Sequence, residues 1–146
     1  MTQEQLKNRA DVPEALTWDV TALYKTRADF EAALNGLNAA TAAFATTYEG
    51  KLTDAKTILA AMKEYEMLIE TATLADHYAM VPEATDLTDP DNVELSRQTA
   101  NAMADISAQL TFFESELIGC DAAILDQVVS EEARFASYIR HIKKNK

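Results

Sequence analysis

Residues 103–117 read MADISAQLTFFESEL, and the spacing of the apolar side chains in this stretch decides the fold class. Five of them recur at alternating intervals of three and four residues: Met103, Ile106, Leu110, Phe113 and Leu117. These intervals follow the turn of an α-helix, whereas a half-buried strand alternates at every second residue. The stretch therefore predicts an amphipathic helix with a narrow apolar seam that packs against other helices.

The chain on either side supplies this helix with a start and an end. Asp89 is suited to cap the first turn, and Pro90 fits the first helical position, where its missing N–H costs nothing. Gly119 is predicted to close the helix in a left-handed conformation. Further on, Asp121 is predicted to cap a short helix, and Ser130 to begin the last helix, which runs into a basic end.

A helix is also predicted between Thr26 and Tyr48. Thr26 and Asp29 have the spacing of a capping box, with Asp in place of the usual Glu. One face of the helix then carries side chains at intervals of three and four residues, of which only Thr41 is polar. These side chains are Phe30, Leu34, Leu37, Thr41, Phe44 and Tyr48.

The next helix is predicted to start at Thr53 and to run to about Val81, a length of roughly 40 Å. Its apolar stripe consists of Ile58, Met62, Tyr65, Ile69, Ala72 and Ala79. Pro82 is expected to end the helix, because proline lacks the N–H that a helix interior requires. Residues 82–89 are then expected to form a polar loop.

Composition agrees with a helical bundle. The 146 residues fit one domain, 48% of them are hydrophobic, and only three glycines and three prolines are present. Sheet folds need more turn residues than this. We therefore predict an all-α bundle of about four to five helices with two long antiparallel helices. An irregular segment over residues 1–25 precedes a helical domain over residues 26–146.

Charge restricts the classes of partner. The net charge is −11, and residues 1–139 alone carry −15, because four cations lie in the last seven residues: Arg140, Lys143, Lys144 and Lys146. Such a surface repels nucleic acid and anionic membranes. One cysteine excludes an internal disulfide framework, and neither a signal-peptide pattern nor a membrane-length apolar run is present. These features favour a cytoplasmic setting.

Few residues are candidates for metal or nucleophilic chemistry. A His-Glu-x-x-His zinc motif needs two histidines one helical turn apart, but the chain has only His77 and His141. Neither histidine follows a Glu at the spacing of a di-iron helix, because Leu74 and Tyr138 stand three residues before them. Cys120 forms no familiar zinc spacing with them and is expected to be a packed thiol.

Two groups of carboxylates are candidate sites. One, Asp86, Asp89, Asp91 and Glu94, lacks the spacing and the glycine of an EF-hand, so caps and a solvated loop are the favoured interpretation. The other, Glu64, Glu66, Glu70, Glu114 and Glu116, is interpreted as solvated helix faces rather than paired acids. Phe112 and Phe113 cannot share one helix face, so one of them is expected to meet a second surface, either another helix of this bundle or a missing part of the protein. No catalytic, cofactor-binding or metal-ligating residue is assigned in this chain.

Three stretches nevertheless resemble one family. Residues 9–24, RADVPEALTWDVTALY, resemble the opening of the oligoendopeptidase F family, with an Arg, then Ile/Val-Pro, then Trp-Asp-Leu-Ser/Thr and an aromatic residue. Residues 110–117, LTFFESEL, resemble the family's Phe-Phe-Glu-Pro-Glu-Leu/Ile stretch, with Ser115 where proline is common. Residues 135–142, FASYIRHI, resemble the helix that precedes the family's Pro-His-x-Leu segment.

The resemblance implies cytoplasmic zinc metallopeptidases that are related to thimet oligopeptidase and cut short peptides. It covers nearly the whole chain but roughly the first quarter of a family member. In the family, a His-Glu-x-x-His helix and a further Glu hold zinc in the later, catalytic part, and none of these residues has a counterpart here. The implied role is a non-catalytic N-terminal lobe that helps to wall a substrate channel, with zinc only in the full-length parent.

The implied partners are the catalytic domain and, in the parent, short peptides. A lobe of this kind is expected to be inactive alone and to self-associate, because it exposes apolar surface. The basic last helix has no stop signal and looks cut rather than finished. One alternative is a stand-alone acidic helical interaction module. A small enzyme built from scattered carboxylates and His77 is a further alternative, but no acid–base geometry can be argued for it.

Overall fold

The computed structural model describes residues 9–145, and this part of the chain is all-α, as predicted. Its helices are α1 (Arg27–Tyr48), α2 (Ala55–Thr85), α3 (Pro90–Gly119), α4 (Ala122–Glu131) and α5 (Ala136–Lys144). Four short 3-10 helices accompany them: η1 (Arg9–Asp11), η2 (Glu14–Leu16), η3 (Val20–Ala22) and η4 (Ala133–Phe135). No strand occurs within residues 9–145.

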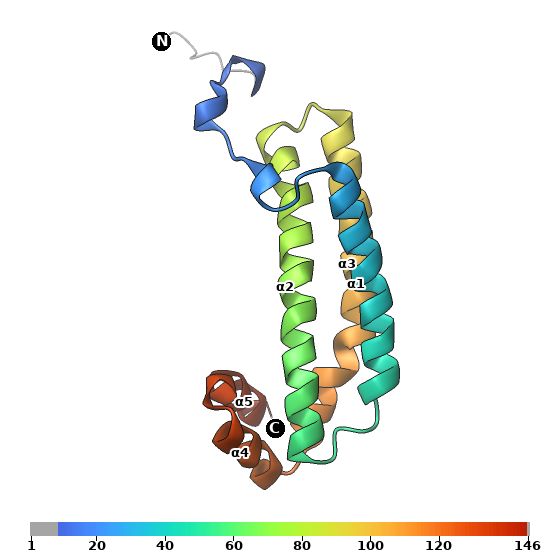
Figure 1. Ribbon diagram of the computed structural model, residues 1–146, viewed down its shortest axis with the longest axis vertical. Coiled ribbons are helices and arrows are strands. Elements are labelled where there is room, and N and C mark those ends of the chain that lie inside the picture. Colours follow the sequence, from blue (N-terminus) through green and yellow to red (C-terminus); the bar gives the residue numbers. More distant parts are fainter. Residues whose placement is uncertain (1–8, 146) are drawn as a thin grey trace.

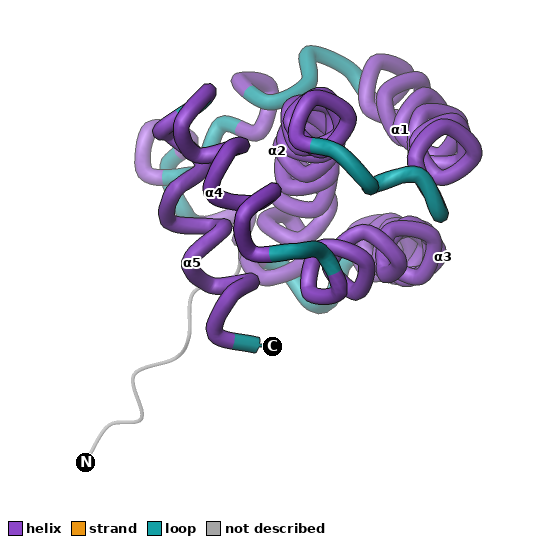
Figure 2. The backbone as a smooth tube through the Cα atoms, turned by 90° about the horizontal axis from the view of Figure 1, so that it is seen from below, coloured by secondary structure: helices purple, strands orange, loops and turns teal. Residues whose placement is uncertain are grey.

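The three longest helices form an elongated bundle in which neighbours in sequence run antiparallel (Figure 1). The two longest are α2 with 31 residues and α3 with 30 residues, which agrees with the predicted pair of long antiparallel helices. Seen along the bundle, α4 and α5 lie on the other side of α2 from α1 (Figure 2). The N-terminal 3-10 helices lie at the opposite end of the bundle from α4 and α5 (Figure 1).

Three of the predicted helix starts are confirmed by side-chain caps. Thr26 and Asp29 form the complete capping box of α1. The carboxylates of Asp89 and Asp121 accept backbone N–H groups at the starts of α3 and α4. The start of α2 lies slightly later than predicted, because the cap is Asp54, which accepts from the Thr57 N–H at 3.0 Å. Such caps satisfy N–H groups that have no partner inside the helix.

The prediction that Pro82 ends α2 is wrong. The helix continues to Thr85, and the Pro82 carbonyl still accepts a hydrogen bond of 3.0 Å from the Asp86 N–H. Proline removes only its own N–H from the helix, so the residues after it keep their bonds. The connection to α3 is therefore shorter than the predicted loop over residues 82–89.

Two predicted boundaries near the C-terminal end also differ. Gly119 is not left-handed; Cys120 leaves α3 in an extended conformation and leads directly to the cap of α4. The glycine with positive φ (72°) is Gly50, after α1. Ser130 does not begin the last helix, because its hydroxyl donates to the Gln127 carbonyl within α4. The break between α4 and η4 falls at Glu132, where φ and ψ are −142° and 88°.

The core follows the predicted apolar stripes with one exception. Phe44, Ile58 and Phe113 are almost completely buried between α1, α2 and α3, and Thr41 is buried with them as predicted. Ile69 is predicted in the stripe of α2 but is 40% exposed. Phe112 packs inside the bundle, with its ring 5.8 Å from that of Phe44 of α1, which agrees with the expectation that one of the two phenylalanines meets another helix.

The N-terminal segment is fastened to the bundle by aromatic rings. Tyr24 makes edge contacts with Phe30 of α1 and with Tyr78 of α2, at ring-centroid distances of 5.8 and 5.5 Å. Asp19 caps η3 by accepting from the Thr21 N–H. Trp18 precedes this cap and is 78% exposed. The segment therefore carries a large apolar side chain out to the surface beside α2.

Candidate functional site

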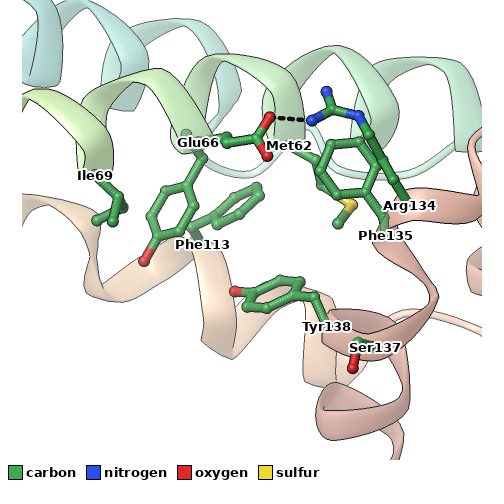
Figure 3. A pocket seen from close by; sticks show the side chains of 9 residues that line it. Met62, Glu66, Ile69, Phe113, Arg134, Phe135, Ser137 and Tyr138 are labelled. Carbon is green, nitrogen blue, oxygen red and sulfur yellow. Dashed lines mark hydrogen bonds and ion pairs between the residues drawn. The ribbon is translucent and has the colours of Figure 1, made fainter.

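A cavity of about 490 Å³ lies between α2, α3 and the η4–α5 segment. Figure 3 shows its lining side chains converging from these three elements. They are Met62, Tyr65, Glu66, Ile69, Phe113, Arg134, Phe135, Ser137 and Tyr138. The cavity forms because the chain turns sharply at Glu132, so that Arg134 of η4 reaches Glu66 of α2 while α5 packs against α3 and α4.

Aromatic rings make most of its wall. The ring of Tyr65 lies 4.6 Å from that of Phe113 and 6.5 Å from that of Tyr138, measured between centroids. The Arg134 guanidinium lies over the ring of Phe135, at 4.4 Å from its centroid. Such a wall is suited to an apolar or planar group.

An ion pair closes one side of the cavity. The Arg134 guanidinium donates to the Glu66 carboxylate of α2, as the dashed line in Figure 3 marks, and lies 3.6 Å from a carboxylate oxygen of Glu132. Both side chains of the Arg134–Glu66 pair are about half exposed. An ion pair of that exposure contributes little to stability, about 0–1 kcal/mol. Its main consequence is to fix η4 beside α2.

Two tyrosines of the cavity have perturbed acidity. Burial, the Tyr65 hydroxyl and the Glu114 carboxylate together hold the pKa of Tyr138 far above its usual range. Burial and Glu114 also raise the pKa of Tyr65. The Tyr138 hydroxyl is buried without a hydrogen-bond partner among the described residues. Both phenols therefore stay protonated at neutral pH and cannot serve there as general bases.

A second apolar hollow of about 540 Å³ lies further along α2, beside the N-terminal segment. Trp18, Val20, Ala22 and Leu23 line it from that segment, with Asp19 between them, and Thr73, Leu74, His77 and Val81 line it from α2. Its side chains are largely apolar, so it is suited to binding an apolar group rather than to proton transfer.

The two histidines occupy separate environments. His77 is exposed on α2, and its Nδ1 lies 2.8 Å from the Thr73 carbonyl one turn earlier. His141 is exposed on α5, with its Nε2 at 3.7 Å from a Glu114 carboxylate oxygen and 3.1 Å from the Asn145 amide nitrogen. Each interacts with different neighbours, so the structure does not assemble them into one site.

Cys120 is partly buried where α3 gives way to α4. Its Sγ lies 3.2 Å from the carbonyl oxygens of both Leu52 and Glu116. This is the packed environment that the sequence predicts, since the thiol is directed at backbone carbonyls rather than at a base.

The acidic residues between α2 and α3 act locally. Asp86 accepts from the backbone N–H and the hydroxyl of Thr88, Asp89 caps α3, and Glu94 pairs with Arg97 at 2.7 Å. Their carboxylates are thus directed at their own neighbours in the chain, as expected for caps and a solvated loop.

Four of the five glutamates proposed as candidates on α2 and α3 have partners in other parts of the bundle. Glu64 accepts from the Tyr48 hydroxyl, Glu66 from Arg134, and Glu116 from the Gly50 N–H at 2.7 Å. Glu114 faces His141 at 3.7 Å. These carboxylates therefore connect different elements of the bundle instead of meeting one another.

The described residues do not fit a zinc site. Over residues 9–145, no group of three or more His, Cys, Asp or Glu side chains is arranged to hold a metal ion. In the same range, none of the helices combines the length and the apolarity needed to cross a membrane. The zinc implied by the family resemblance therefore has no ligand set in this part of the chain.

Sequence reasoning missed both hollows on α2. They depend on how the N-terminal segment and the η4–α5 segment lie on α2, and hydrophobic spacing within one helix does not report this. Two signals were available: Trp18 is the only tryptophan, and residues 64–96 contain nine carboxylates and no Lys or Arg. An exposed large aromatic side chain is typical of an interaction surface.

Comparison with known proteins gives one relative. No family model and no solved structure matches the chain. The chain is 23% identical over 133 residues to the protein named "Oligoendopeptidase F, plasmid" from Lactococcus lactis subsp. cremoris. The match covers 90% of this chain but only 22% of that protein's length. The chain is thus a distant relative of oligoendopeptidase F and spans about a fifth of it.

Proposed function

We propose that this chain is the non-catalytic N-terminal helical lobe of an oligoendopeptidase F-like zinc metallopeptidase. In this proposal the parent protein hydrolyses short peptides in the cytoplasm. The zinc and the residues that activate water belong to a catalytic part outside residues 1–146. The lobe contributes architecture, by walling one side of the channel that admits flexible peptides.

One observation carries the proposal. The similarity to oligoendopeptidase F runs through 90% of this chain while covering 22% of the relative, so almost the whole chain corresponds to one fraction of a much longer peptidase. The opening motif over residues 9–24 supports placing that fraction at the N-terminus. A fully helical bundle is compatible with a lobe whose role is structural.

The surface is compatible with such a lobe. Trp18, Leu74 and Ile69 are all at least 38% exposed beside or on α2, and both apolar hollows open along this helix. Exposed apolar side chains of this kind mark contacts with other polypeptide segments.

The proposal is tested by assaying the purified 146-residue chain with zinc and an internally quenched fluorogenic peptide. The expected result is no hydrolysis above the buffer background, because the described residues supply no zinc ligand set. The result that would overturn the proposal is hydrolysis that co-purifies with the chain, stops on addition of a chelator and returns with zinc. A His77→Ala variant that lost such activity would instead support the small-enzyme alternative.

The exposed face of α2 also favours a second candidate, a stand-alone acidic interaction module. A module of this kind needs no further catalytic domain, so the two candidates differ in the size of the natural protein.

A further inference from the structure

The two apolar hollows share one helix. The hollow beside α5 uses Met62, Tyr65, Glu66 and Ile69 of α2, and the hollow beside the N-terminal segment uses Thr73, Leu74, His77 and Val81. Figure 1 shows the intervening stretch of α2 with the N-terminal segment near one of its ends and α4–α5 near the other. One side of this stretch is turned away from α1 and α3. We name this surface, from Glu66 to Val81, the outer face of α2.

The spacing of the hollows suits a helix. Their centres along α2 are about eleven residues apart, which is roughly 16 Å at 1.5 Å per residue. Eleven residues complete about three turns, so side chains that far apart lie on the same face of a second helix. A helix running alongside α2 can therefore place one large apolar side chain in each hollow, as in other helix-in-groove contacts.

The charge that α2 contributes to this face is of one sign. Residues 64–96 contain nine carboxylates and no Lys or Arg; Glu66 lines the first hollow, and Glu70 lies between the two hollows along α2. A helix that docks here gains from basic side chains flanking its apolar anchors and is disfavoured if it is acidic. The interaction surface therefore selects for charge as well as for shape.

A basic and an aromatic side chain of this chain already contact α2 at one end of its outer face. Arg134 of η4 donates to Glu66 of α2, and the adjoining Phe135 packs into the core beside Met62. Lys63 and Glu132 add a second contact between the same elements at 3.7 Å. A basic and aromatic pair from outside α2 thus already recognises this helix, and it does so within the first hollow.

From this spacing, charge and internal example, we propose that the outer face of α2 binds a basic amphipathic helix of a partner protein. The partner helix carries two large apolar side chains eleven residues apart, one for each hollow, with Lys or Arg between and beside them. Trp18 of the N-terminal segment covers the partner's apolar side chain in the second hollow. This inference goes beyond the proposed function and does not depend on it.

The probe is a synthetic 18-residue peptide of alanine and lysine with leucine at its fourth and fifteenth positions. Trp18 is the only tryptophan and lines the second hollow, so its fluorescence reports binding directly. The expected result is a saturable blue shift with Kd below about 100 µM. The affinity is expected to fall at least tenfold between 50 and 500 mM NaCl, because the contacts include exposed charges.

Two control peptides test geometry and charge on the unchanged protein. Moving the second leucine to the thirteenth position puts the anchors nine residues apart, on opposite faces of the peptide helix. That peptide is expected to bind at least tenfold more weakly, and one with Glu in place of Lys is expected not to bind. Equal binding of all three peptides, or no binding of the first at 1 mM, would overturn the inference.

A matched pair of variants tests the location. Leu74→Glu places a charge in the second hollow, whereas Leu87→Glu changes a more exposed leucine, 71% accessible, in the turn between α2 and α3. The first is expected to weaken binding of the leucine peptide at least tenfold and the second less than twofold. Equal losses of peptide affinity in the two variants would contradict the assignment of the binding site. A dimer of the unchanged chain that Leu74→Glu disperses would also contradict it, because a second copy of the chain would then occupy the outer face of α2.

Discussion

The Tyr48 hydroxyl donates a hydrogen bond of 2.7 Å to the Glu64 carboxylate and so fastens the C-terminal end of α1 to α2. The two residues lie 16 positions apart on antiparallel helices, on either side of the turn at Gly50. Glu116 of α3 accepts the Gly50 N–H at 2.7 Å, so carboxylates of two helices hold this end of the bundle. The bond also has a consequence for the pH dependence of stability.

Tyr48→Phe is expected to destabilise the protein by about 1 kcal/mol, because it removes one side-chain hydrogen bond without opening a cavity. Burial and the bond to Glu64 raise the pKa of Tyr48 from 10.0 to about 12. A raised folded-state pKa means that the unfolded chain loses this proton first. The stabilisation is therefore complete below pH 10 and is lost between pH 10 and 12.

Urea titrations of the unchanged chain and the Tyr48→Phe variant at pH 8 and pH 11 measure both effects. The difference in the free energy of unfolding between the two proteins is expected to shrink at pH 11. Glu64→Gln keeps an acceptor while removing the charge, so it is expected to retain part of the bond. A difference that grows at pH 11 would contradict this account of the pair.

Phe113→Ala is expected to cost about 3–5 kcal/mol, the range for deleting a buried aromatic side chain. Its ring is completely buried and lies 4.6 and 5.4 Å from the rings of Tyr65 and Phe44. The neighbouring Phe112 is only partly buried, so Phe112→Ala provides the matched control and is expected to cost clearly less. Chemical denaturation of both variants measures the two losses of stability. A larger loss for Phe112→Ala than for Phe113→Ala would contradict the prediction.

Thr26→Ala is expected to destabilise the start of α1 by about 1 kcal/mol. The Thr26 hydroxyl accepts the Asp29 N–H at 3.1 Å, and the Asp29 carboxylate accepts the Thr26 N–H at 3.1 Å. Thr26→Ser keeps the hydroxyl, so its stability is expected to stay close to that of the unchanged chain. Hydrogen exchange at the Asp29 amide is expected to accelerate only in the alanine variant, and unchanged exchange there would argue against the capping role.

The sequence predicted best those features that depend on neighbouring residues. The caps at Thr26, Asp89 and Asp121 each consist of a side chain and an N–H two or three positions away, so a local pattern suffices to find them. The apolar seam of α3 was equally predictable, because Ile106, Leu110, Phe113 and Leu117 are all buried on one side of the helix.

The wrong predictions involve residues whose conformation depends on the next part of the chain. Gly119 needs no left-handed turn, because Cys120 extends straight into the Asp121 cap. Pro82 lies close enough to the natural end of α2 that losing one N–H does not stop it. In both places a residue typical of helix ends was given more weight than its surroundings justified.

The candidate site was beyond local reasoning for a different reason. Arg134 and Glu66, which close the cavity beside α5, are 68 positions apart in the sequence. Their meeting depends on the bend at Glu132 and on the packing of α4 against α2, neither of which has a local signature. The buried Tyr138 hydroxyl, which has no hydrogen-bond partner among the described residues, could not be predicted from hydrophobic spacing either.

The central claim is that these 146 residues form one lobe of a much larger peptidase. The most direct test is the intact mass of the natural protein in its source cells, detected with an antibody raised against this chain. The account predicts a single species several times heavier than 16.1 kDa, consistent with a match that covers only 22% of oligoendopeptidase F. A species of 16.1 kDa would contradict it and would identify the chain as a complete protein.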